Sequence, residues 1–220
     1  MQYDNEHPDE VKNSITPSGY FGDGPENIVQ LNNFMKPEEL NFLREFAKNL
    51  NEWDVTRTHY NDNGTITYES DYWDNRVASS TTLDRVSTEV LPLIDTLNDR
   101  LEKIIRIKYK VLAKPIGPAI VRWLPGQFQL PHADKELHEG PDAGTPNDFP
   151  HYDIGALYYL NDDYEGGELY FPKQGLEFKP QAGSAYFFPG DLNYIHGVKE
   201  IKSGIRYTSP AFWTITSLEV

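Results

Sequence analysis

The stretch that decides the fold is residues 123–134, Trp-Leu-Pro-Gly-Gln-Phe-Gln-Leu-Pro-His-Ala-Asp. Its apolar start and its Pro-Gly pair predict a strand and a turn, and His132 and Asp134 follow directly. On a strand or at its end, residues i and i+2 project to the same side, so this imidazole and this carboxylate can face one site. The stretch therefore predicts β-structure and a candidate pair of metal ligands.

The C-terminal half of the chain is rich in short segments of the same kind. From about Lys110, runs of Val, Ile, Tyr, Phe and Trp are separated by Gly, Pro and Asn-Asp turn signals. Many short strands with turns between them favour a sandwich or a small barrel. The expected strands are 119–124, 154–160, 168–171, 184–188, 195–198 and 206–215.

Two helical segments are expected before this β-rich half. The first opens at Pro37, with two acids at the positive end of the helix dipole, and apolar residues continue at helical spacing to Leu50. The second covers about 80–107, also with apolar residues at helical spacing, and Pro92 marks a kink or a break in it. The remaining expected elements are a strand at 28–31 and a hairpin turn at 61–64.

Helices first and strands afterwards predict one α+β unit that is mainly β. We expect residues 1–27 to form an extended or partly disordered N-terminal arm, because they are rich in Pro, Gly, Asp and Asn without periodicity. Residues 28–220 are expected to form a single domain, with helical support over 28–109 and a β core over 110–220.

The composition narrows the chemistry that such a domain can carry. The chain has 220 residues, a formal net charge of -14 and no cysteine. Without cysteine, a metal must be held by His, Asp, Glu, carbonyl or water ligands, and disulfides, iron–sulfur clusters and a cysteine nucleophile are excluded. The acidic balance argues against nucleic-acid binding, and the lack of a long apolar run argues against a membrane span. Because the acidic N-terminus does not resemble a signal peptide, we expect a soluble cytoplasmic protein.

The pattern His-x-Asp occurs three times, starting at His7, His132 and His151, so the tripeptide alone does not identify a site. His7 lies in the predicted arm, whereas the other two lie beside predicted strands. A third ligand can come from His196, which follows a Pro-Gly-Asp turn between two apolar segments. Two histidines and one carboxylate with open positions are typical of non-haem Fe(II). From the pattern alone, a metal role and a structural role are equally open.

Arg206, on an apolar predicted strand, needs an anion if it is buried, because a guanidinium stays charged. With this residue, the chain resembles the 2-oxoglutarate- and Fe(II)-dependent oxygenases, specifically their prolyl 4-hydroxylase-like branch. The resemblance runs from Val121 to Trp213, and its strength comes from five blocks in the right order. The blocks are 123–126 with 131–134, 157–161, 166–172, 183–189, and 196–198 with Arg206 and Trp213.

This resemblance implies a double-stranded β-helix, or jelly-roll, buttressed by helices. It implies that His132, Asp134 and His196 bind Fe(II), and that Arg206 pairs with the distal carboxylate of 2-oxoglutarate. Ascorbate often keeps such iron reduced, so it is a further expected cofactor.

More positions follow from the same resemblance. Tyr159 matches a residue that often hydrogen-bonds 2-oxoglutarate. Trp123 stands where many members have a tyrosine near the cosubstrate, and a tryptophan can donate only through its ring nitrogen. Leu169 and Trp213 would line the pocket, although structural packing explains them equally well.

The segment 135–150 would be a loop over the mouth of the site, and His151 and Asp153 would stand at the start of a strand rather than bind metal. The region from His132 to Asp153 contains six acidic residues and one lysine, Lys135. A solvated loop explains them, and so does an acidic lip that favours a positively charged substrate. The acids are Asp134, Glu136, Glu139, Asp142, Asp148 and Asp153.

The function implied is hydroxylation of an unactivated C–H bond, with a prolyl residue of a peptide or protein as the expected substrate. A competing hypothesis keeps this chemistry but assigns it to a free amino acid or a small metabolite, with the loop 135–150 as a lid. A non-catalytic jelly-roll binding protein, a cupin-like metal isomerase and a zinc hydrolase are three further hypotheses. Neither the isomerase nor the hydrolase would need Arg206. The sequence does not indicate an oligomeric state.

Overall fold

The computed structural model describes residues 14–55 and 72–218. Its helices are α1 (Pro37–Asn49), α2 (Ser80–Val86) and α3 (Val90–Tyr109), with the short 3-10 turns η2 (Pro25–Asn27) and η3 (Leu192–Tyr194). Its strands are β1 (Val29–Leu31), β2 (Val77–Ala78), β3 (Val111–Ile116), β4 (Ile120–Trp123), β5 (Gln129–His132), β6 (Ile154–Tyr159), β7 (Glu165–Gly166), β8 (Leu169–Phe171), β9 (Leu176–Phe178), β10 (Ala185–Pro189), β11 (His196–Val198), β12 (Ile201–Ser203) and β13 (Arg206–Leu218).

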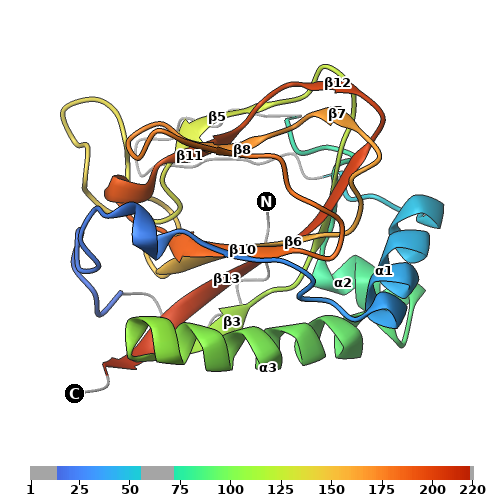
Figure 1. The fold of residues 1–220 in the computed structure, drawn as a ribbon, viewed down its shortest axis with the longest axis horizontal. Coiled ribbons are helices and arrows are strands. Elements are labelled where there is room, and N and C mark those ends of the chain that lie inside the picture. Colours follow the sequence, from blue (N-terminus) through green and yellow to red (C-terminus); the bar gives the residue numbers. More distant parts are fainter. Residues whose placement is uncertain (1–13, 56–71, 219–220) are drawn as a thin grey trace.

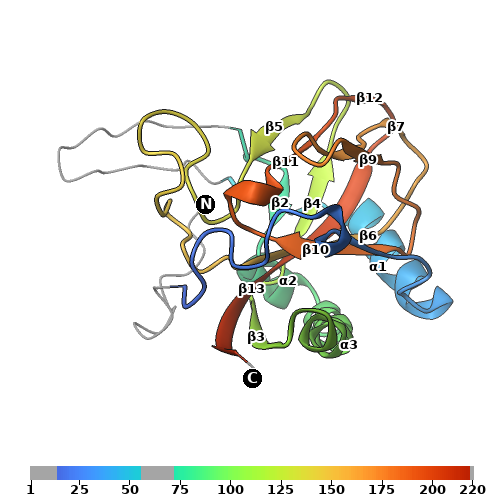
Figure 2. The same ribbon diagram turned by 60° about the vertical axis from the view of Figure 1, so that its left-hand side comes forward.

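The strands form two facing sheets, and α3 lies on the outer side of the larger one (Figures 1 and 2). The larger sheet has the order β1-β10-β6-β13-β4-β2, with β3 also paired to β13. The smaller sheet has the order β5-β11-β8-β9, and β12 pairs with β7. All of these pairings are antiparallel. This arrangement confirms the predicted jelly-roll core with helical support.

The predicted elements are recovered with one difference in the helices. All six strands expected after residue 118 are present, as β4, β6, β8, β10, β11 and β13. The helix expected over 80–107 is instead two helices, because α2 ends at Val86 and α3 begins at Val90. Pro92 lies in the first turn of α3, where its missing N–H breaks no helical hydrogen bond. The proline therefore marks the start of a helix rather than a kink within one.

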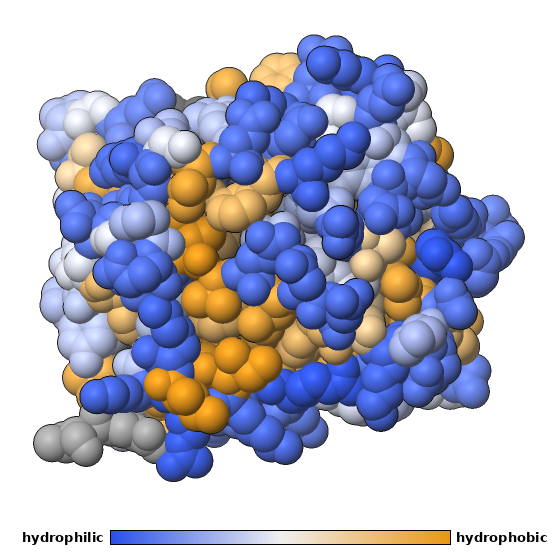
Figure 3. Space-filling model, viewed as in Figure 1, coloured by the Kyte–Doolittle hydropathy of each residue, from blue (hydrophilic) through white to orange (hydrophobic). Residues whose placement is uncertain are grey.

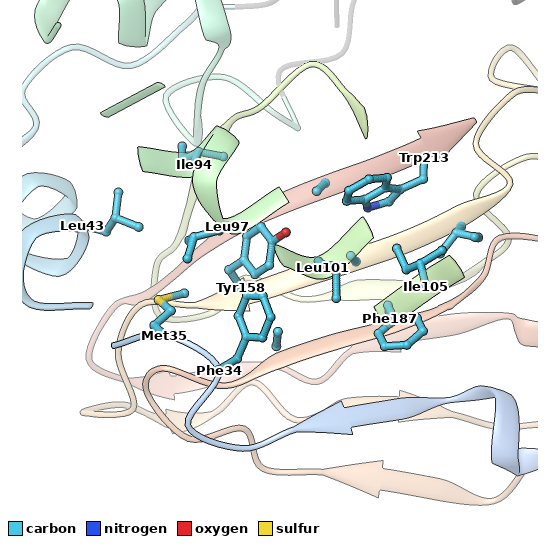
Figure 4. Close-up of a cluster of buried hydrophobic side chains, with 14 of the residues drawn as sticks. Phe34, Met35, Leu43, Ile94, Leu97, Leu101, Ile105, Tyr158, Phe187 and Trp213 are labelled. Atoms are coloured by element: carbon cyan, nitrogen blue, oxygen red, sulfur yellow. The ribbon is translucent and has the colours of Figure 1, made fainter. Parts of the chain in front are cut away.

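The main hydrophobic core lies between α3 and the larger sheet (Figure 4). Leu97, Leu101 and Ile105 of α3 are fully buried there against side chains of β6, β10 and β13. Tyr158 of β6 enters this core as well, and its hydroxyl donates to Asn98 Oδ1 at 2.8 Å. Because this layer fixes one face of the larger sheet, the opposite face of the same strands is left to build a cavity.

The N-terminal residues of the described chain pack against the rest of the molecule. Thr16 is buried, and Ser18 and Gly19 make hydrogen bonds to distant side chains. His7, His59 and the hairpin turn expected at 61–64 lie outside the described residues. None of the helices in the described ranges is long and apolar enough to cross a membrane. The face shown in Figure 3 is mostly hydrophilic, with a band of hydrophobic residues near its centre.

Candidate metal centre and anion site

Two neighbouring strands of the smaller sheet place two histidines side by side. His132 at the end of β5 pairs directly with His196 at the start of β11, and their ring centroids are 4.5 Å apart. The Nδ1 atom of His132 lies 3.1 Å from the carbonyl of Leu130, and the Nδ1 of His196 lies 3.1 Å from that of Tyr194. If each Nδ1 carries the proton that these carbonyls accept, both Nε2 atoms keep a lone pair for a metal.

Asp134, in the turn after β5, completes the group. Its Oδ1 lies 3.7 Å from Nε2 of His132 and 3.8 Å from Nε2 of His196. Its Oδ2 is buried and accepts no hydrogen bond from the residues that the structure describes. In the described part of the chain, these three residues are the one group of His and acidic side chains whose ligand atoms lie within 4.8 Å of one another. The structure thus brings together the three ligands expected from the sequence.

The electrostatics of this group suit a divalent cation. Burial raises the pKa of Asp134 to about 8. Burial lowers the pKa of His132, and burial together with His132 lowers that of His196 further. Both imidazoles are therefore neutral near pH 7, and the carboxyl group lacks a positive partner. A cation with nitrogen and oxygen ligands would satisfy the unpartnered Oδ2 and favour the ionised carboxylate. The donor set fits Fe(II).

Metal affinity is expected to depend on pH through Asp134. Binding requires the carboxylate, so below the metal-free pKa of about 8 each metal ion must displace a proton. We expect the apparent affinity for Co²⁺ to fall roughly tenfold per pH unit below about pH 8 and to level off above it. Titration at pH 6, 7 and 8 with visible absorption measures this. An affinity that stays flat over this range would contradict the expectation.

Gly155 on β6 provides the space for the Asp134 carboxylate. A Cβ at this position would lie 2.4 Å from Oδ2 of Asp134 and 2.9 Å from Cε2 of Phe188. Alanine at 155 is expected to push the carboxylate away from the two histidines and to weaken metal binding by about tenfold or more. Isothermal titration with Co²⁺ tests this, while the melting temperature of the metal-free variant reports any general loss of stability. Unchanged affinity in Gly155→Ala would show that Asp134 tolerates the displacement.

Arg206 supplies a second functional group to the same cavity. It is 1% exposed at the start of β13, and its Nη2 donates to the hydroxyl of Tyr159 at 2.9 Å. Its Nε is buried without a partner, and among the described residues no carboxylate forms a salt bridge with it. A buried guanidinium that lacks a counter-ion is costly, so this position favours binding of an anionic group.

Aromatic rings surround this guanidinium. Its Cζ lies 5.6 Å from the ring centroid of Trp123 and 4.9 Å from that of Tyr159. Trp123 also makes an edge contact with Trp73, with 5.6 Å between the ring centroids. Tyr159 therefore orients Arg206 through its hydroxyl, and Trp123 forms an aromatic wall beside the guanidinium.

The two sites share one cavity of about 440 Å³ between the sheets. It is lined by the three candidate ligands, by Arg206 and Trp123, and by a mainly apolar wall. Leu169 lines the cavity as expected, but Trp213 does not, because it is fully buried in the core against α3 (Figure 4). Of the two roles expected for Trp213, pocket lining is wrong and packing is confirmed, because it stands an odd number of positions from Arg206 on β13 and therefore on the other face of the sheet.

The segment 135–150 contributes to the cavity mouth through residues that include Leu137, His138 and Phe149. Three of the six acids of this region are buried, so they do not form an exposed acidic lip. These are Asp134, Glu136 and Asp153. The Oδ1 of Asp153 lies 3.1 Å from Nζ of Lys135, and neither His151 nor Asp153 belongs to the metal-ligand group.

An aromatic stack at the cavity wall was not foreseen. The ring of Tyr152 stacks on Phe149 at 4.9 Å and on Phe212 at 4.1 Å between centroids, and all three line the cavity. Phe212 lies an even number of positions from Arg206 on one strand, so strand periodicity was the signal that could have found it. Gly155 carried no such signal, since its neighbour Asp134 comes from the turn after β5, which is distant in sequence.

The sequence of this chain is similar to those of known proteins. The family model of the 2OG-Fe(II) oxygenase superfamily matches residues 118–214. Prolyl 4-hydroxylase 1 of Arabidopsis thaliana is 27% identical over 209 residues, which cover 83% of this chain and 66% of that protein. Prolyl 3-hydroxylase 1 of Gallus gallus is 37% identical over 68 residues, which cover 29% of this chain and 9% of that protein. The chain thus spans less than two thirds of these relatives.

Solved structures share the fold. The viral collagen prolyl hydroxylase of Paramecium Bursaria Chlorella virus-1, solved as a 2OG complex, superimposes with a TM-score of 0.57 at 17% identity, over 86% of this chain and 95% of that one. A prolyl-4-hydroxylase of Pseudomonas putida gives a TM-score of 0.58 at 18% identity, over 86% of this chain and 92% of that one. At these identities, the likeness concerns the jelly-roll fold.

Proposed function

The chain belongs to the 2OG-Fe(II) oxygenase superfamily, in the branch of the prolyl hydroxylases, and from this we propose that it is an Fe(II)- and 2-oxoglutarate-dependent dioxygenase. It hydroxylates an unactivated C–H bond, and its substrate is a prolyl residue of a peptide or protein. We assign this activity to a single domain, residues 28–220.

One observation carries the proposal. Within residues 14–55 and 72–218, one cavity is lined both by a cluster of potential metal ligands whose carboxylate pairs with no Lys or Arg, and by a buried guanidinium that pairs with no carboxylate. His132, Asp134 and His196 would hold the iron, and Arg206 would bind the distal carboxylate of 2-oxoglutarate. A cupin-like isomerase or a zinc hydrolase would use the first group but would leave Arg206 buried without a purpose.

The residues of the chain bind the metal and the cosubstrate, orient them, and exclude water from the site. When bound, Fe(II) and 2-oxoglutarate would activate O₂, which oxidises 2-oxoglutarate to succinate and carbon dioxide with one oxygen atom and converts C–H to C–OH with the other. Arg206, oriented by Tyr159, fixes one end of the cosubstrate, and Trp123 packs beside it. The apolar wall, including Leu169 and Phe188, keeps the site dry, which strengthens the electrostatic contacts within it.

The relatives support a prolyl substrate, since they are named prolyl 3- and prolyl 4-hydroxylases. The aromatic stack of Phe149, Tyr152 and Phe212 gives the cavity a flat apolar wall that suits an uncharged ring. The same chemistry on a free amino acid remains the second candidate, because Leu137 and His138 of the segment 135–150 line the cavity mouth.

Succinate release tests the proposal and separates these candidates. Purified protein with Fe(II), O₂ and 2-oxoglutarate is incubated with a proline-containing peptide, with the same peptide carrying alanine for proline, or with free proline. We expect the proline peptide alone to raise succinate above the uncoupled rate and to gain about 16 mass units from one oxygen atom. Stimulation by free proline but not by the peptide would transfer the proposal to the small-molecule candidate, and stimulation by neither would contradict both.

We also predict that ascorbate assists the enzyme and that the protein is located in the cytoplasm. A reductant that returns oxidised iron to Fe(II) is expected to prolong turnover without changing the initial rate. Progress curves with and without ascorbate measure this.

A further inference from the structure

The third His-x-Asp copy has no place in the metal-ligand group, yet its aspartate is among the most buried charged residues of the described chain. Asp153 is 1% exposed, and its Oδ1 lies 3.1 Å from Nζ of Lys135, which is 4% exposed. Lys135 directly follows the candidate ligand Asp134. Burying two charges is costly unless further hydrogen bonds satisfy them, so a pair kept at this position calls for a reason.

The remaining partners of this pair come from the N-terminal segment. The hydroxyl of Ser14 donates to Oδ1 of Asp153, and the hydroxyl of Thr16 donates to the same oxygen at 2.9 Å. Nζ of Lys135 donates to the carbonyl of Thr16 at 3.0 Å. On its other side, Oδ2 of Asp153 accepts from the backbone N–H of Ile215 on β13 at 2.9 Å. The Lys135–Asp153 pair therefore makes hydrogen bonds to two distant parts of the chain, the N-terminal segment and β13.

A second set of contacts ties the same segment to the turns beside the site. The hydroxyl of Ser18 donates to Oε2 of Glu136 at 3.0 Å, and the N–H of Leu192 donates to the same oxygen at 2.7 Å. The N–H of Gly19 donates to Oδ2 of Asp191 at 3.1 Å. Figures 1 and 2 show the blue N-terminal segment beside the yellow loop that follows β5 and beside the turn before β11.

Backbone hydrogen bonds connect these contacts to the candidate ligand itself. The N–H of Gly190 donates to the carbonyl of Asp153 at 2.8 Å. The carbonyl of Gly190 accepts from the N–H of Asp134 at 2.9 Å and from that of Lys135 at 3.1 Å. A Cβ on Gly190 would lie 2.1 Å from the carbonyl oxygen of Tyr152, so only glycine allows this close approach. The turn that carries Asp134 is thus connected to Asp153 in two ways. One connection is the ion pair of Lys135, and the other is the pair of backbone hydrogen bonds through Gly190.

We propose that Asp153, Lys135, Ser14 and Thr16 form a clamp whose role is to position Asp134 for metal binding. The inference rests on the proposed function, because it requires Asp134 to be a metal ligand. Residues 14–19 are, in this view, part of the site: they hold the metal-bearing turn against β13 and η3 without touching the metal. The clamp residues are positioning residues, since they act through Asp134.

Anaerobic Co²⁺ titration with visible absorption tests the clamp, comparing wild type with Asp153→Asn and Thr16→Val. Asp153→Asn removes the charge pair, and we expect Co²⁺ to bind about tenfold to a hundredfold more weakly, with altered band intensities. Thr16→Val keeps the ion pair but removes the threonine hydroxyl, which donates to Oδ1 of Asp153 and accepts from Nζ of Lys135, so a several-fold loss of affinity is expected. Glu39→Gln is the control, because Glu39 on α1 forms an ion pair with Arg100 on α3 at 2.6 Å, and neither residue lines the cavity.

Melting temperatures of the metal-free proteins are measured alongside. The clamp is supported if Thr16→Val, and Asp153→Asn where it folds, lose Co²⁺ affinity while Glu39→Gln is destabilised but keeps wild-type affinity. Wild-type affinity and spectrum in folded Thr16→Val overturn the clamp and leave the proposed function intact. A wild-type protein that binds no Co²⁺ overturns the proposed function and the clamp with it. Equal loss of affinity in Glu39→Gln would assign the effect to general destabilisation and overturn the clamp.

Discussion

Replacing His196 by alanine is expected to abolish metal binding and turnover together. His196 provides one of three ligand atoms that lie within 4.8 Å of one another, and it is buried opposite His132. Two remaining ligands leave the ion with too few protein contacts to compete with water. Because the oxidising chemistry depends on bound metal, we expect succinate release to fall by at least about a thousandfold. Co²⁺ absorption and succinate assays measure the two effects.

His138→Ala is the matched control for this variant. His138 also lines the cavity, but it does not belong to the ligand group. Its replacement removes an imidazole from the same cavity and is expected to leave Co²⁺ affinity unchanged. Wild-type metal affinity in His196→Ala would remove His196 from the metal centre, and loss of affinity in His138→Ala would show that the ligand set is larger than proposed.

Replacing Arg206 by methionine is expected to affect the cosubstrate and not the metal. Removing one partner of a buried guanidinium–carboxylate pair costs about 3 kcal/mol or more of binding free energy. This cost corresponds to a weakening of 2-oxoglutarate binding by roughly a hundredfold or more. The metal-free and cosubstrate-free protein should be as stable as wild type or more stable, because the variant removes a buried charge for which the described residues provide no carboxylate, and whose Nε has no hydrogen-bond partner among them.

Arg122→Met is the control for this second variant. Arg122 lies on β4 next to Trp123, the residue that pairs with Arg206 of β13. Its guanidinium, however, lies over Trp53, 4.3 Å from the ring centroid. It does not line the cavity, so its replacement should leave 2-oxoglutarate binding unchanged. If Arg206→Met weakens metal and 2-oxoglutarate equally, Arg206 is a structural residue and the anion site must be sought elsewhere.

The candidate metal site could be predicted because its geometry is largely local. His132 and Asp134 are two residues apart at the end of one strand, so the sequence spacing alone places them on one side. His196 was proposed from the Pro-Gly-Asp turn before it and Arg206 from its place on an apolar strand, and the resemblance then assigned their roles. Cross-strand pairing explains how His196 reaches His132. The jelly-roll could be predicted for a similar reason, since each strand carries its own pattern of apolar residues and turns.

Strand periodicity also explains a wrong expectation. Arg206 and Phe212 line the cavity, and Trp213 packs in the core on the opposite face of β13. Each face of this long strand carries a large aromatic residue, Phe212 on one and Trp213 on the other, so residue type did not distinguish them. Counting positions from Arg206 would have done so, because alternate residues of a strand face opposite sides.

The parts that could not be predicted depend on contacts between distant segments. Gly155 is required because the Asp134 carboxylate approaches it from the turn after β5. Asp153 seemed to be half of a metal-binding pattern, and its partners Ser14 and Thr16 lie in a segment whose composition predicts an arm. Neither relation leaves a periodic trace in the sequence, so only the three-dimensional structure reveals it.

Anaerobic titration of the wild-type protein with Fe(II) and 2-oxoglutarate tests the central claim most directly. Chelation of iron by the cosubstrate in this cavity is expected to give a visible charge-transfer band that saturates at one equivalent of each. The band should be absent from His196→Ala, and in Arg206→Met it should appear only at much higher 2-oxoglutarate concentrations. A wild-type protein that gives no band, or a band that persists unchanged in His196→Ala, would contradict the assignment of the three ligands and of the oxygenase function.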